Sequence, residues 1–261
     1  MHTAAVTIAT QESDAGGPRA LVAELESWAT ATSWVIWLEL SGSLGRGAGD
    51  RYSDVDAGIG VSEVGHLDSI EAAVSDFGAV AARVREPFGA GMTHLITVYR
   101  DGRQLSLVVM PEDGRRGLPP EAMALVDKAG HLREKLDRNR WDPDDTEMRR
   151  WTFMSCLGAA DALKHAARGR MWRAIRSLSE ARDLYLQLIA AREGVVFPQF
   201  GAVSLENANR PIPLTIAQTL PTSLSPGAVA SSVRALVRHL EPFVDAYGLT
   251  GLASALDLTA R

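Results

Sequence analysis

Two carboxylates and a glycine-rich turn lie within one short stretch of the chain. Gly42 and Ser43 open the turn, and Asp54 and Asp56 follow it at the start of an apolar segment. Alternate residues of a strand point to the same face, so Asp54 and Asp56 would present two carboxylates about 7 Å apart. Like charges this close repel each other, and Mg²⁺ is a natural counter-ion because it prefers oxygen ligands and shares its shell with phosphates.

The turn has the composition of a phosphate-binding loop. Glycine lets the main chain approach a ligand closely, so the N–H groups near Gly42 and the hydroxyl of Ser43 can contact a phosphate. We assign Arg46 and Ser53 to the same nucleotide site. A phosphate cradle beside metal-binding carboxylates is the equipment of phosphoryl or nucleotidyl transfer. The alternative is a loop in which the aspartates only cap and turn the chain.

The order of these residues resembles a known signature. Gly-Ser-Leu-Gly-Arg at 42–46, Tyr-Ser-Asp at 52–54 and then Asp56 resemble the Gly-Ser and Asp-x-Asp motif of the nucleotidyltransferase superfamily that includes DNA polymerase beta. The likeness is greatest to its antibiotic-modifying branch. The resemblance implies Mg²⁺-dependent transfer of a nucleoside monophosphate, AMP by preference, from ATP or another nucleoside triphosphate to a hydroxyl of a small molecule. An aminoglycoside is the leading acceptor, which would make the protein an antibiotic-resistance enzyme.

One expected residue of that superfamily is absent. The family pattern has a third carboxylate on a later strand, and in the matching run, Gln104–Met110, Ser106 stands in its place. A serine hydroxyl is a poor Mg²⁺ ligand and no general base at neutral pH. Glu112 and Asp113 are alternative acids, and a shifted strand register is another explanation. The alternative function is therefore a catalytically impaired nucleotide-binding or regulatory protein.

Apolar runs on both sides must position the motif. Trp34–Leu40 leads into the turn and the segment around Asp54–Val61 leads out of it, so both are expected to be strands. The other predicted elements of this half are helices at 18–32 and 66–84 and a hairpin of 93–100 with 104–110, joined at Asp101-Gly102. Together they predict an α/β (α+β) nucleotidyltransferase domain with a small mixed sheet.

The second half of the chain has the apolar spacing of helices. The predicted helices cover 121–138, 145–168, 171–192 and 227–247, with shorter ones at 213–220 and 250–258. A proline- and glycine-rich stretch before residue 121 is the best linker. We therefore expect a disordered N-terminus at 1–17, a nucleotidyltransferase domain at 18–115 and an all-α helical-bundle domain at 121–261.

The resemblance implies that the helical domain supplies a general base and a lysine for the nucleotide phosphates. Asp161 and Lys164 are three residues apart, on one face of a predicted helix, and Glu180 is a second candidate base. The alternative for Asp161 and Lys164 is an exposed ion pair. In this branch of the superfamily the site can also be shared across a homodimer.

The net charge and hydropathy of the sequence indicate which kinds of partner and which compartment to expect. The net charge of −5 argues against a nucleic-acid partner held by a broad basic surface, and it is compatible with a cationic acceptor. No run is long and apolar enough to span a membrane, and the N-terminus lacks the pattern of a signal peptide. The single cysteine, Cys156, suits a reducing compartment. We therefore expect a cytoplasmic protein that binds a nucleoside triphosphate and a small hydroxylated acceptor.

Overall fold

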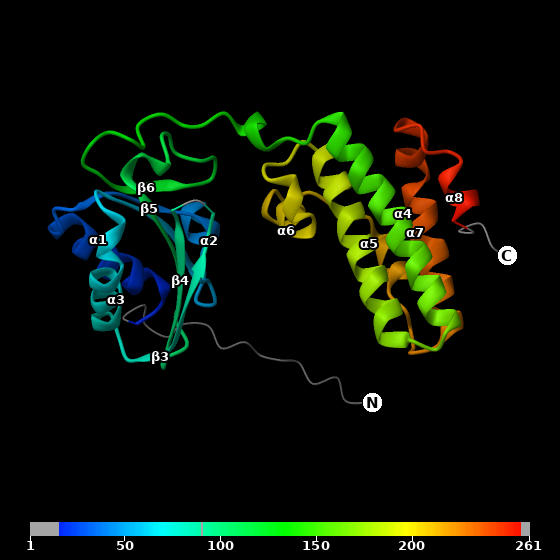
Figure 1. Ribbon diagram of the computed structural model, residues 1–261, viewed down its shortest axis with the longest axis horizontal. Helices are drawn as coiled ribbons and strands as arrows, with labels where there is room; N and C mark the ends of the chain where they lie inside the picture. Colours follow the sequence, from blue (N-terminus) through cyan, green and yellow to red (C-terminus); the bar gives the residue numbers. More distant parts are fainter. Residues whose placement is uncertain (1–15, 90, 257–261) are drawn as a thin grey trace. The chain divides into compact units, whose positions relative to one another are not determined.

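The computed structural model describes residues 16–89 and 91–256. The chain divides into two compact units, the first ending at Asp137 and the second beginning at Arg138 (Figure 1). The expected disorder of residues 1–17 falls almost entirely outside the described residues. The predicted linker before residue 121 belongs to the first unit, so the division between the units lies later in the chain than the predicted boundary at 115–121.

Six strands form one mixed sheet in the first unit, in the order β3-β4-β5-β2-β1-β6. The strands are β1 Val35–Leu40, β2 Val55–Val61, β3 Val80–Pro87, β4 Thr93–Tyr99, β5 Gln104–Pro111 and β6 Met123–Asp127. Strands β2 and β5 are parallel, and all other neighbours are antiparallel. The mixed sheet, the two strands flanking the glycine-rich turn and the β4–β5 hairpin are confirmed.

Helices α1 (Pro18–Ala31) and α3 (Leu67–Asp76) lie on one face of this sheet (Figure 1). Leu21 and Leu25 of α1 and Ile70 of α3 are fully buried against apolar side chains of the strands. The opposite face carries Trp37, which packs with Leu118 in a smaller apolar cluster. The short elements η1 (Val64–His66) and η2 (Glu112–Gly114) complete the unit, together with α2 (Gly42–Gly45) in the glycine-rich turn. The face under α1 and α3 thus holds the main apolar core of the unit, and the opposite face holds only the smaller cluster around Trp37.

The helix predicted over 66–84 is wrong in its second half, because α3 ends early and β3 follows. Strand β3 pairs along its length with β4, at an edge of the sheet. Its arginines reach back to α3, where Arg83 pairs with Glu71 at 3.6 Å and Arg85 pairs with Asp68 at 2.6 Å. Alanine-rich sequence favours a helix locally, but strand pairing and these cross-element contacts favour the strand.

The helix predicted over 121–138 is also wrong, because β6 pairs with β1 there. Glu121 has a φ of 63°, a left-handed conformation that cannot start a right-handed helix. The Asp127 carboxylate then accepts hydrogen bonds from the N–H groups of His131 (2.8 Å) and Leu132 (3.0 Å), which turns the chain away from β6. This strand keeps residues up to Asp137 in the first unit.

The second unit is all helical. Its elements are η3 Arg138–Trp141, α4 Asp145–Ala167, α5 Met171–Arg192, η4 Pro198–Phe200, α6 Ala202–Asn207, η5 Leu214–Thr219, α7 Pro226–Ala246 and α8 Leu252–Ala255. The three long helices share one apolar core. The close approach of α4 and α5 depends on small residues, because a Cβ at Gly158 would lie 3.1 Å from the Ala181 Cβ and Ser155 donates a 2.7 Å hydrogen bond to the Ala181 carbonyl.

The long helices of this unit match their predicted ranges closely. Asp144 caps α4 by accepting a 2.8 Å hydrogen bond from the Glu147 N–H, as its sequence position suggests. The predicted helix at 213–220 is a 3₁₀ segment, α6 was not anticipated, and part of the helix predicted at 250–258 lies outside the described residues. No helix in the described part of the chain has the length and apolar character needed to cross a membrane.

Candidate functional site

The glycine-rich turn rests directly against the second aspartate. Gly42 has a φ of +62°, and a Cβ added to it would lie 2.2 Å from Oδ2 of Asp56. The Ser41 N–H donates a 2.7 Å hydrogen bond to the Asp56 carbonyl, which fixes the turn to the start of β2. The backbone at position 42 therefore has room beside the carboxylate only because glycine has no side chain.

A hydroxyl pair closes the loop between the turn and β2. The Ser43 hydroxyl donates to Oγ of Ser53 at 2.8 Å, and the Asp50 N–H donates to the same oxygen at 2.9 Å. The Ser53 hydroxyl in turn lies 3.2 Å from Oδ1 of Asp50, its acceptor. Ser53, which the sequence assigned to nucleotide binding, therefore holds the loop in shape, and Ser43 is the hydroxyl nearer the turn.

The two aspartates differ in environment. Asp54 precedes β2 and is exposed, whereas Asp56 lies within β2 and is partly buried. Burial raises the pKa of the Asp56 carboxyl, and the negative charge of Asp54 raises it further. A hydrogen bond from Ser106 and the proximity of His94 and Arg46 lower this pKa in part. The carboxylates thus form a locally negative site that a cation would stabilise.

Arg46 supplies positive charge at the end of the turn. Its guanidinium lies 3.6 Å from a carboxylate oxygen of Glu121, and both side chains are partly exposed. The chain passes close by here, because a Cβ at Gly45 would lie 3.1 Å from the Glu121 carbonyl. Arg46 is therefore shared between Asp56 and Glu121, a partner that the sequence did not reveal because it is distant in the chain.

Ser106 occupies the position directly beside Asp56, so the expected strand register is confirmed. β2 and β5 pair in parallel with Asp56 opposite Ser106. On the next strand, Nε2 of His94 lies 2.8 Å from the Ser106 hydroxyl oxygen. Sequence reasoning missed His94. Counting outward from the Asp101-Gly102 turn would have placed it on the same face, diagonal to Ser106.

A buried ion pair lies on the same face, three residues before Gly42. Glu39 of β1 is only 2% exposed and pairs with the partly exposed Arg115. Burial raises the pKa of the Glu39 carboxyl, and the nearby Arg115 charge lowers it in part. One oxygen, Oε2, is buried without a hydrogen-bond partner among the described residues. Gly58 makes room for this carboxylate, since a Cβ there would lie 2.8 Å from Oε1 of Glu39.

The residues at the turn fit a magnesium–nucleotide. Mg²⁺ usually binds proteins through one or two carboxylates and takes its other ligands from water and substrate phosphates. Asp54 and Asp56 are such a pair, and burial together with the charge of Asp54 raises the pKa of the Asp56 carboxyl. Within residues 16–89 and 91–256, no group of three or more His, Cys, Asp or Glu side chains is arranged to bind a metal.

The predicted residues of the helical unit make contacts with their own helices. The Lys164 ammonium donates a 3.0 Å hydrogen bond to Asp161, and both side chains are about half exposed. Glu180 is exposed and accepts a 2.8 Å hydrogen bond from Arg176. Exposed pairs of this kind contribute little to stability, so a ligand could replace these contacts at small cost. Asp161, Lys164 and Glu180 therefore remain accessible to a ligand.

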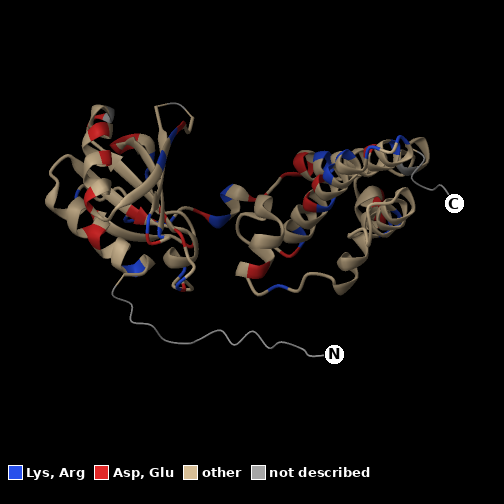
Figure 2. Cartoon of the chain, turned by 90° about the horizontal axis from the view of Figure 1, so that it is seen from below, with Lys and Arg blue, Asp and Glu red and all other residues tan. Residues whose placement is uncertain are grey.

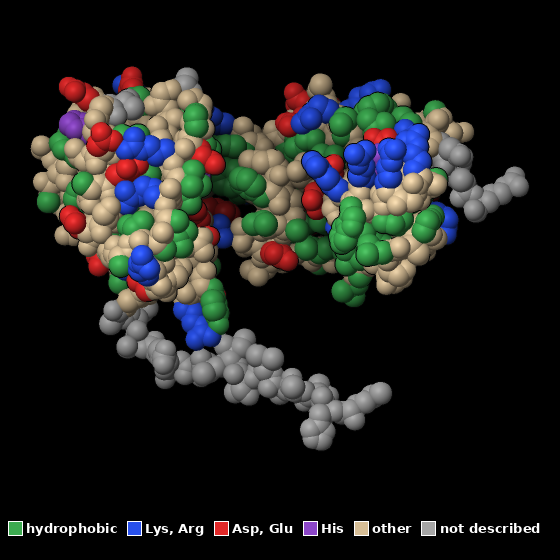
Figure 3. Space-filling model, turned by 60° about the horizontal axis from the view of Figure 1, so that its bottom comes forward, with side chains coloured by type: hydrophobic (Ala, Val, Ile, Leu, Met, Phe, Trp, Pro, Cys, Tyr) green, Lys and Arg blue, Asp and Glu red, His purple; other side chains and the backbone are tan. Residues whose placement is uncertain are grey.

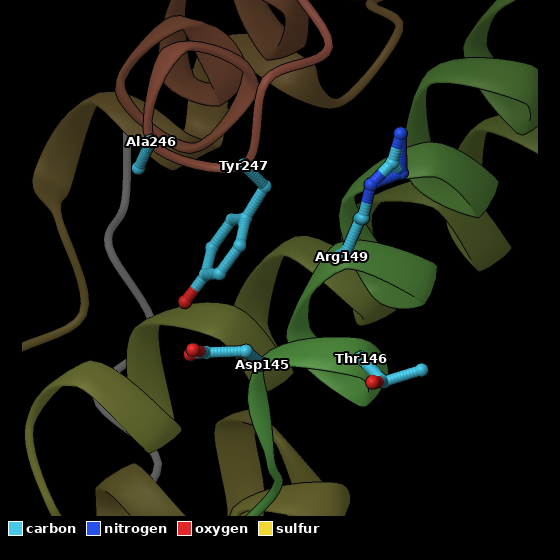
Figure 4. Close-up of a pocket in the computed structure, with 5 residues that line it drawn as sticks. All are labelled: Asp145, Thr146, Arg149, Ala246 and Tyr247. Atoms are coloured by element: carbon cyan, nitrogen blue, oxygen red, sulfur yellow. The ribbon is translucent and has the colours of Figure 1, made fainter.

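A hollow of about 460 Å³ lies in the helical unit and contains none of the predicted site residues. Its lining comes from the start of α4 and the end of α7: Asp145, Thr146, Arg149, Ala246 and Tyr247. Figure 4 shows the Tyr247 hydroxyl and the Asp145 carboxylate directed toward the same space, with Arg149 directed away. Burial and the Asp145 charge raise the pKa of Tyr247. The hollow is wide open, and we assign no chemistry to it.

Acidic residues concentrate in the unit that holds the two aspartates. Residues 1–137 contain 20 Asp and Glu against 12 Lys and Arg, whereas residues 138–261 contain 12 against 15. Figure 2 shows the distribution over the elements, and Figure 3 shows basic side chains grouped on one face of the helical unit. The net charge of −5 is therefore the sum of a charge of −8 on the first unit and a charge of +3 on the second.

No protein-family model and no curated protein sequence matches the chain. Among solved structures, the chain is similar to an aminoglycoside 6-adenyltransferase from Bacillus subtilis, with 15% identity and a TM-score of 0.36 over 93% of this chain and 92% of that chain. It is also similar to a nucleotidyltransferase-like protein from Exiguobacterium sibiricum 255-15, with 12% identity and a TM-score of 0.41 over 88% and 77% of the two chains. At these identities and TM-scores, we rest the functional proposal on the site itself.

Proposed function

We propose that the first unit binds a nucleoside triphosphate with Mg²⁺ and that the protein transfers the nucleoside monophosphate to a hydroxyl of a small molecule. ATP, and hence AMP transfer, is the first choice of nucleotide. The observation that carries this proposal is the contact of Gly42 with Asp56, because a Cβ at Gly42 would lie 2.2 Å from the carboxylate oxygen. This closeness supports a single site in which the Gly42 turn would bind phosphate and Asp56 would bind the metal ion.

The proposed roles follow from this geometry. A helix leaves the N–H groups of its first turn without internal partners, and in α2 those of Gly42 and Ser43 are suited to phosphate oxygens. Arg46 adds positive charge there, and Asp54 and Asp56 would hold the Mg²⁺. The bound ion would neutralise charge on the triphosphate and polarise its phosphoryl oxygens.

The proposed reaction forms one bond and breaks another. The acceptor oxygen bonds to the α-phosphorus, the bond from that phosphorus to the bridging oxygen breaks, and pyrophosphate leaves. The proton of the acceptor hydroxyl must pass to a base. Asp161 and Glu180 are the proposed bases and Lys164 the proposed phosphate ligand of the helical unit, since Lys164 and Glu180 are exposed and Asp161 is about half exposed.

A cationic acceptor fits the charge of the first unit. The excess of Asp and Glu in residues 1–137, 20 against 12 Lys and Arg, favours a positively charged molecule over an anionic one near the aspartates. An aminoglycoside combines several amino groups with the hydroxyls that the reaction needs. We therefore propose an aminoglycoside-type acceptor.

One observation favours a second candidate, a protein that binds nucleotide without transferring it. The residue paired with Asp56 on β5 is Ser106, and its hydroxyl is engaged with His94 at 2.8 Å. A serine in this setting neither holds a second metal ion strongly nor accepts a proton at neutral pH. In that case Asp54 and Asp56 would retain the nucleotide while turnover is lost.

The experiment that separates the two is pyrophosphate release from each common nucleoside triphosphate with Mg²⁺. Aminoglycosides and lincosamides serve as acceptors, and the Asp56→Asn variant is the control. Release that requires an acceptor and disappears in the variant supports transfer. Nucleotide binding without release, again lost in the variant, supports the binding protein. If the wild-type protein binds no nucleotide, both candidates are wrong.

A further inference from the structure

Three polar side chains on neighbouring strands form a connected row on the face that carries the two aspartates. Asp56 lies on β2, Ser106 lies opposite it on β5, and His94 lies on β4. Nε2 of His94 is 2.8 Å from Oγ of Ser106. Ser106 is the register partner of Asp56 on the neighbouring parallel strand, and a hydrogen bond from its hydroxyl lowers the Asp56 pKa. The row therefore connects a carboxylate of the proposed metal site to an imidazole two strands away.

The direction of the hydrogen bonds follows from the number of hydrogens. An ionised carboxylate only accepts, so the single hydrogen of the Ser106 hydroxyl points to Asp56. The serine oxygen is then an acceptor toward the ring, and Nε2 of His94 must carry the hydrogen that it donates. A neutral His94 is thereby fixed as the tautomer protonated on Nε2. The ring of Phe88 packs edge-on against His94, with centroids 5.7 Å apart.

We propose that His94 is a positioning residue for Asp56, which it holds through Ser106 in the orientation that faces the Gly42 turn. The inference rests on the proposed function, because it concerns how the carboxylate meets a metal–nucleotide. Asp54 lies close enough for its charge to repel Asp56, and the row holds Asp56 against that repulsion by donating to it from the β5 side. Ser106 is then a link that orients Asp56.

Outer partners of this kind set metal affinity. Groups that hydrogen-bond to metal ligands fix the ligand's orientation, and their loss typically reduces metal affinity by about 10–100-fold. A glutamine at position 94 retains an N–H donor at the end of its side chain, whereas a leucine retains similar bulk without a donor. His94→Gln, His94→Leu and Ser106→Ala therefore separate the hydrogen bond from the packing.

The test measures binding of Mn²⁺ together with a non-hydrolysable ATP analogue by electron paramagnetic resonance, and unfolding midpoints show that each variant is folded. We expect His94→Leu and Ser106→Ala each to weaken Mn²⁺ binding by about 10–100-fold. Because His94 acts through Ser106, the double variant should be no weaker than Ser106→Ala alone. His94→Gln should stay much closer to the wild-type affinity than His94→Leu does.

A second measurement needs no ligand. Long-range ¹H–¹⁵N spectra of the histidine rings should show His94 protonated on Nε2, with a changed Nε2 signal in Ser106→Ala. The proposal is overturned if His94 is protonated on Nδ1 alone, if His94→Leu binds Mn²⁺ like the wild type, or if the two single effects add in the double variant. Wild-type protein that fails to bind the Mn²⁺–nucleotide contradicts the proposed function instead. Binding that Asp56→Asn abolishes but His94→Leu does not contradicts only the role of His94.

Discussion

Gly42 and Asp56 are packed so closely that a single methyl group would separate the turn from the carboxylate. A Cβ at Gly42 would lie 2.2 Å from Oδ2 and 3.1 Å from Cγ of Asp56. Because a side chain can rotate more easily than a backbone can move, the added atom would displace the carboxylate. Position 42 must therefore be glycine if the Asp56 carboxylate is to keep its place beside the turn. One matched pair of glycine variants tests this requirement.

Gly42→Ala should abolish binding of the magnesium–nucleotide, whereas Gly47→Ala should leave it intact. Both glycines have positive φ, +62° and +73°, so an alanine at either position costs about 1–2 kcal/mol of backbone strain. A Cβ at Gly47 meets nothing within 4 Å. Calorimetric titration of both variants, with urea unfolding for stability, checks this. Equal losses of binding in the two variants would show that strain, and not displacement of Asp56, is responsible.

Asp56→Asn should make the ligand-free protein more stable at neutral pH. Burial and Asp54 raise the pKa of Asp56, so the folded protein binds its proton more tightly than the unfolded chain does. The free energy of unfolding therefore falls as the pH rises from the ordinary Asp pKa of about 3.9 through the raised value. The variant carries no such charge, and its advantage should be present at about pH 8 and shrink toward about pH 4.

Urea unfolding of the wild type and Asp56→Asn across this pH range measures the effect. Asp113→Asn, which removes an exposed carboxylate of the same unit, is the matched control and should show little change. Added Mg²⁺ and ATP should reverse the order by stabilising only the wild type, because a ligand stabilises the state that binds it. A variant less stable than the wild type at neutral pH would mean that the Asp56 carboxylate stabilises the free protein.

The site was predictable where it is local in sequence and unpredictable where it depends on pairing between strands. The turn at Gly42 and the following Asp54 and Asp56 lie within one short stretch, so spacing alone placed them together. His94 meets Ser106 only through the register of the β4–β5 hairpin. The sequence contains the hairpin signal at Asp101-Gly102, but the pairing of one side chain with another across the hairpin is not encoded by either strand alone.

The fold shows the same division. The long amphipathic helices α4, α5 and α7 carry their apolar residues at helical spacing and match their predicted ranges. The two edge strands, the first part of β3 and the whole of β6, were predicted as helix because their composition is helical. β3 pairs with the next strand, β4, whereas β6 pairs with β1, which is distant in the chain. Arg85 finds Asp68 only when β3 forms beside α3. In β3 and β6, strand pairing and contacts with other elements therefore outweigh the local preference for a helix.

Arg115→Ala should destabilise the first unit by about 3 kcal/mol, because it leaves the buried charge of Glu39 without its partner. Burial already raises the Glu39 pKa, and loss of Arg115 would raise it further. The folded variant then takes up a proton more readily than the unfolded chain, so the loss of stability should be smaller at low pH. Urea unfolding at several pH values measures both effects.

Two further variants make that experiment specific. Glu39→Gln introduced into Arg115→Ala removes the unpaired charge and should recover most of the lost stability. Arg116→Ala, at the neighbouring exposed arginine, should change stability by less than about 0.5 kcal/mol. Equal stability of Arg115→Ala and Arg116→Ala would contradict the prediction. It would mean that the Glu39 carboxylate is stable without Arg115, through another partner or by binding a proton.

Cys156 should be unreactive toward thiol reagents until the helical unit opens. The side chain is 2% exposed in the core of α4, α5 and α7, and burial raises the pKa of its thiol to about 11. Little reactive thiolate is therefore present in the folded protein at neutral pH. Labelling with a chromogenic disulfide should be slow in native buffer and rapid in denaturant. Since Cys156 is the single cysteine, all labelling reports on this helical unit.

Mg²⁺ and ATP should slow the labelling of Cys156 if Lys164 contacts the nucleotide phosphates as proposed. A ligand that binds only the folded form lowers the population of the open form, and labelling through a rapid opening equilibrium follows that population. Lys164→Ala should remove the protection while changing stability by less than about 0.5 kcal/mol, because its ion pair with Asp161 is exposed. Arg176→Ala, which breaks the comparable exposed pair with Glu180, is the matched control and should retain protection. Nucleotide that binds the protein without slowing the labelling would place the phosphates on the first unit alone.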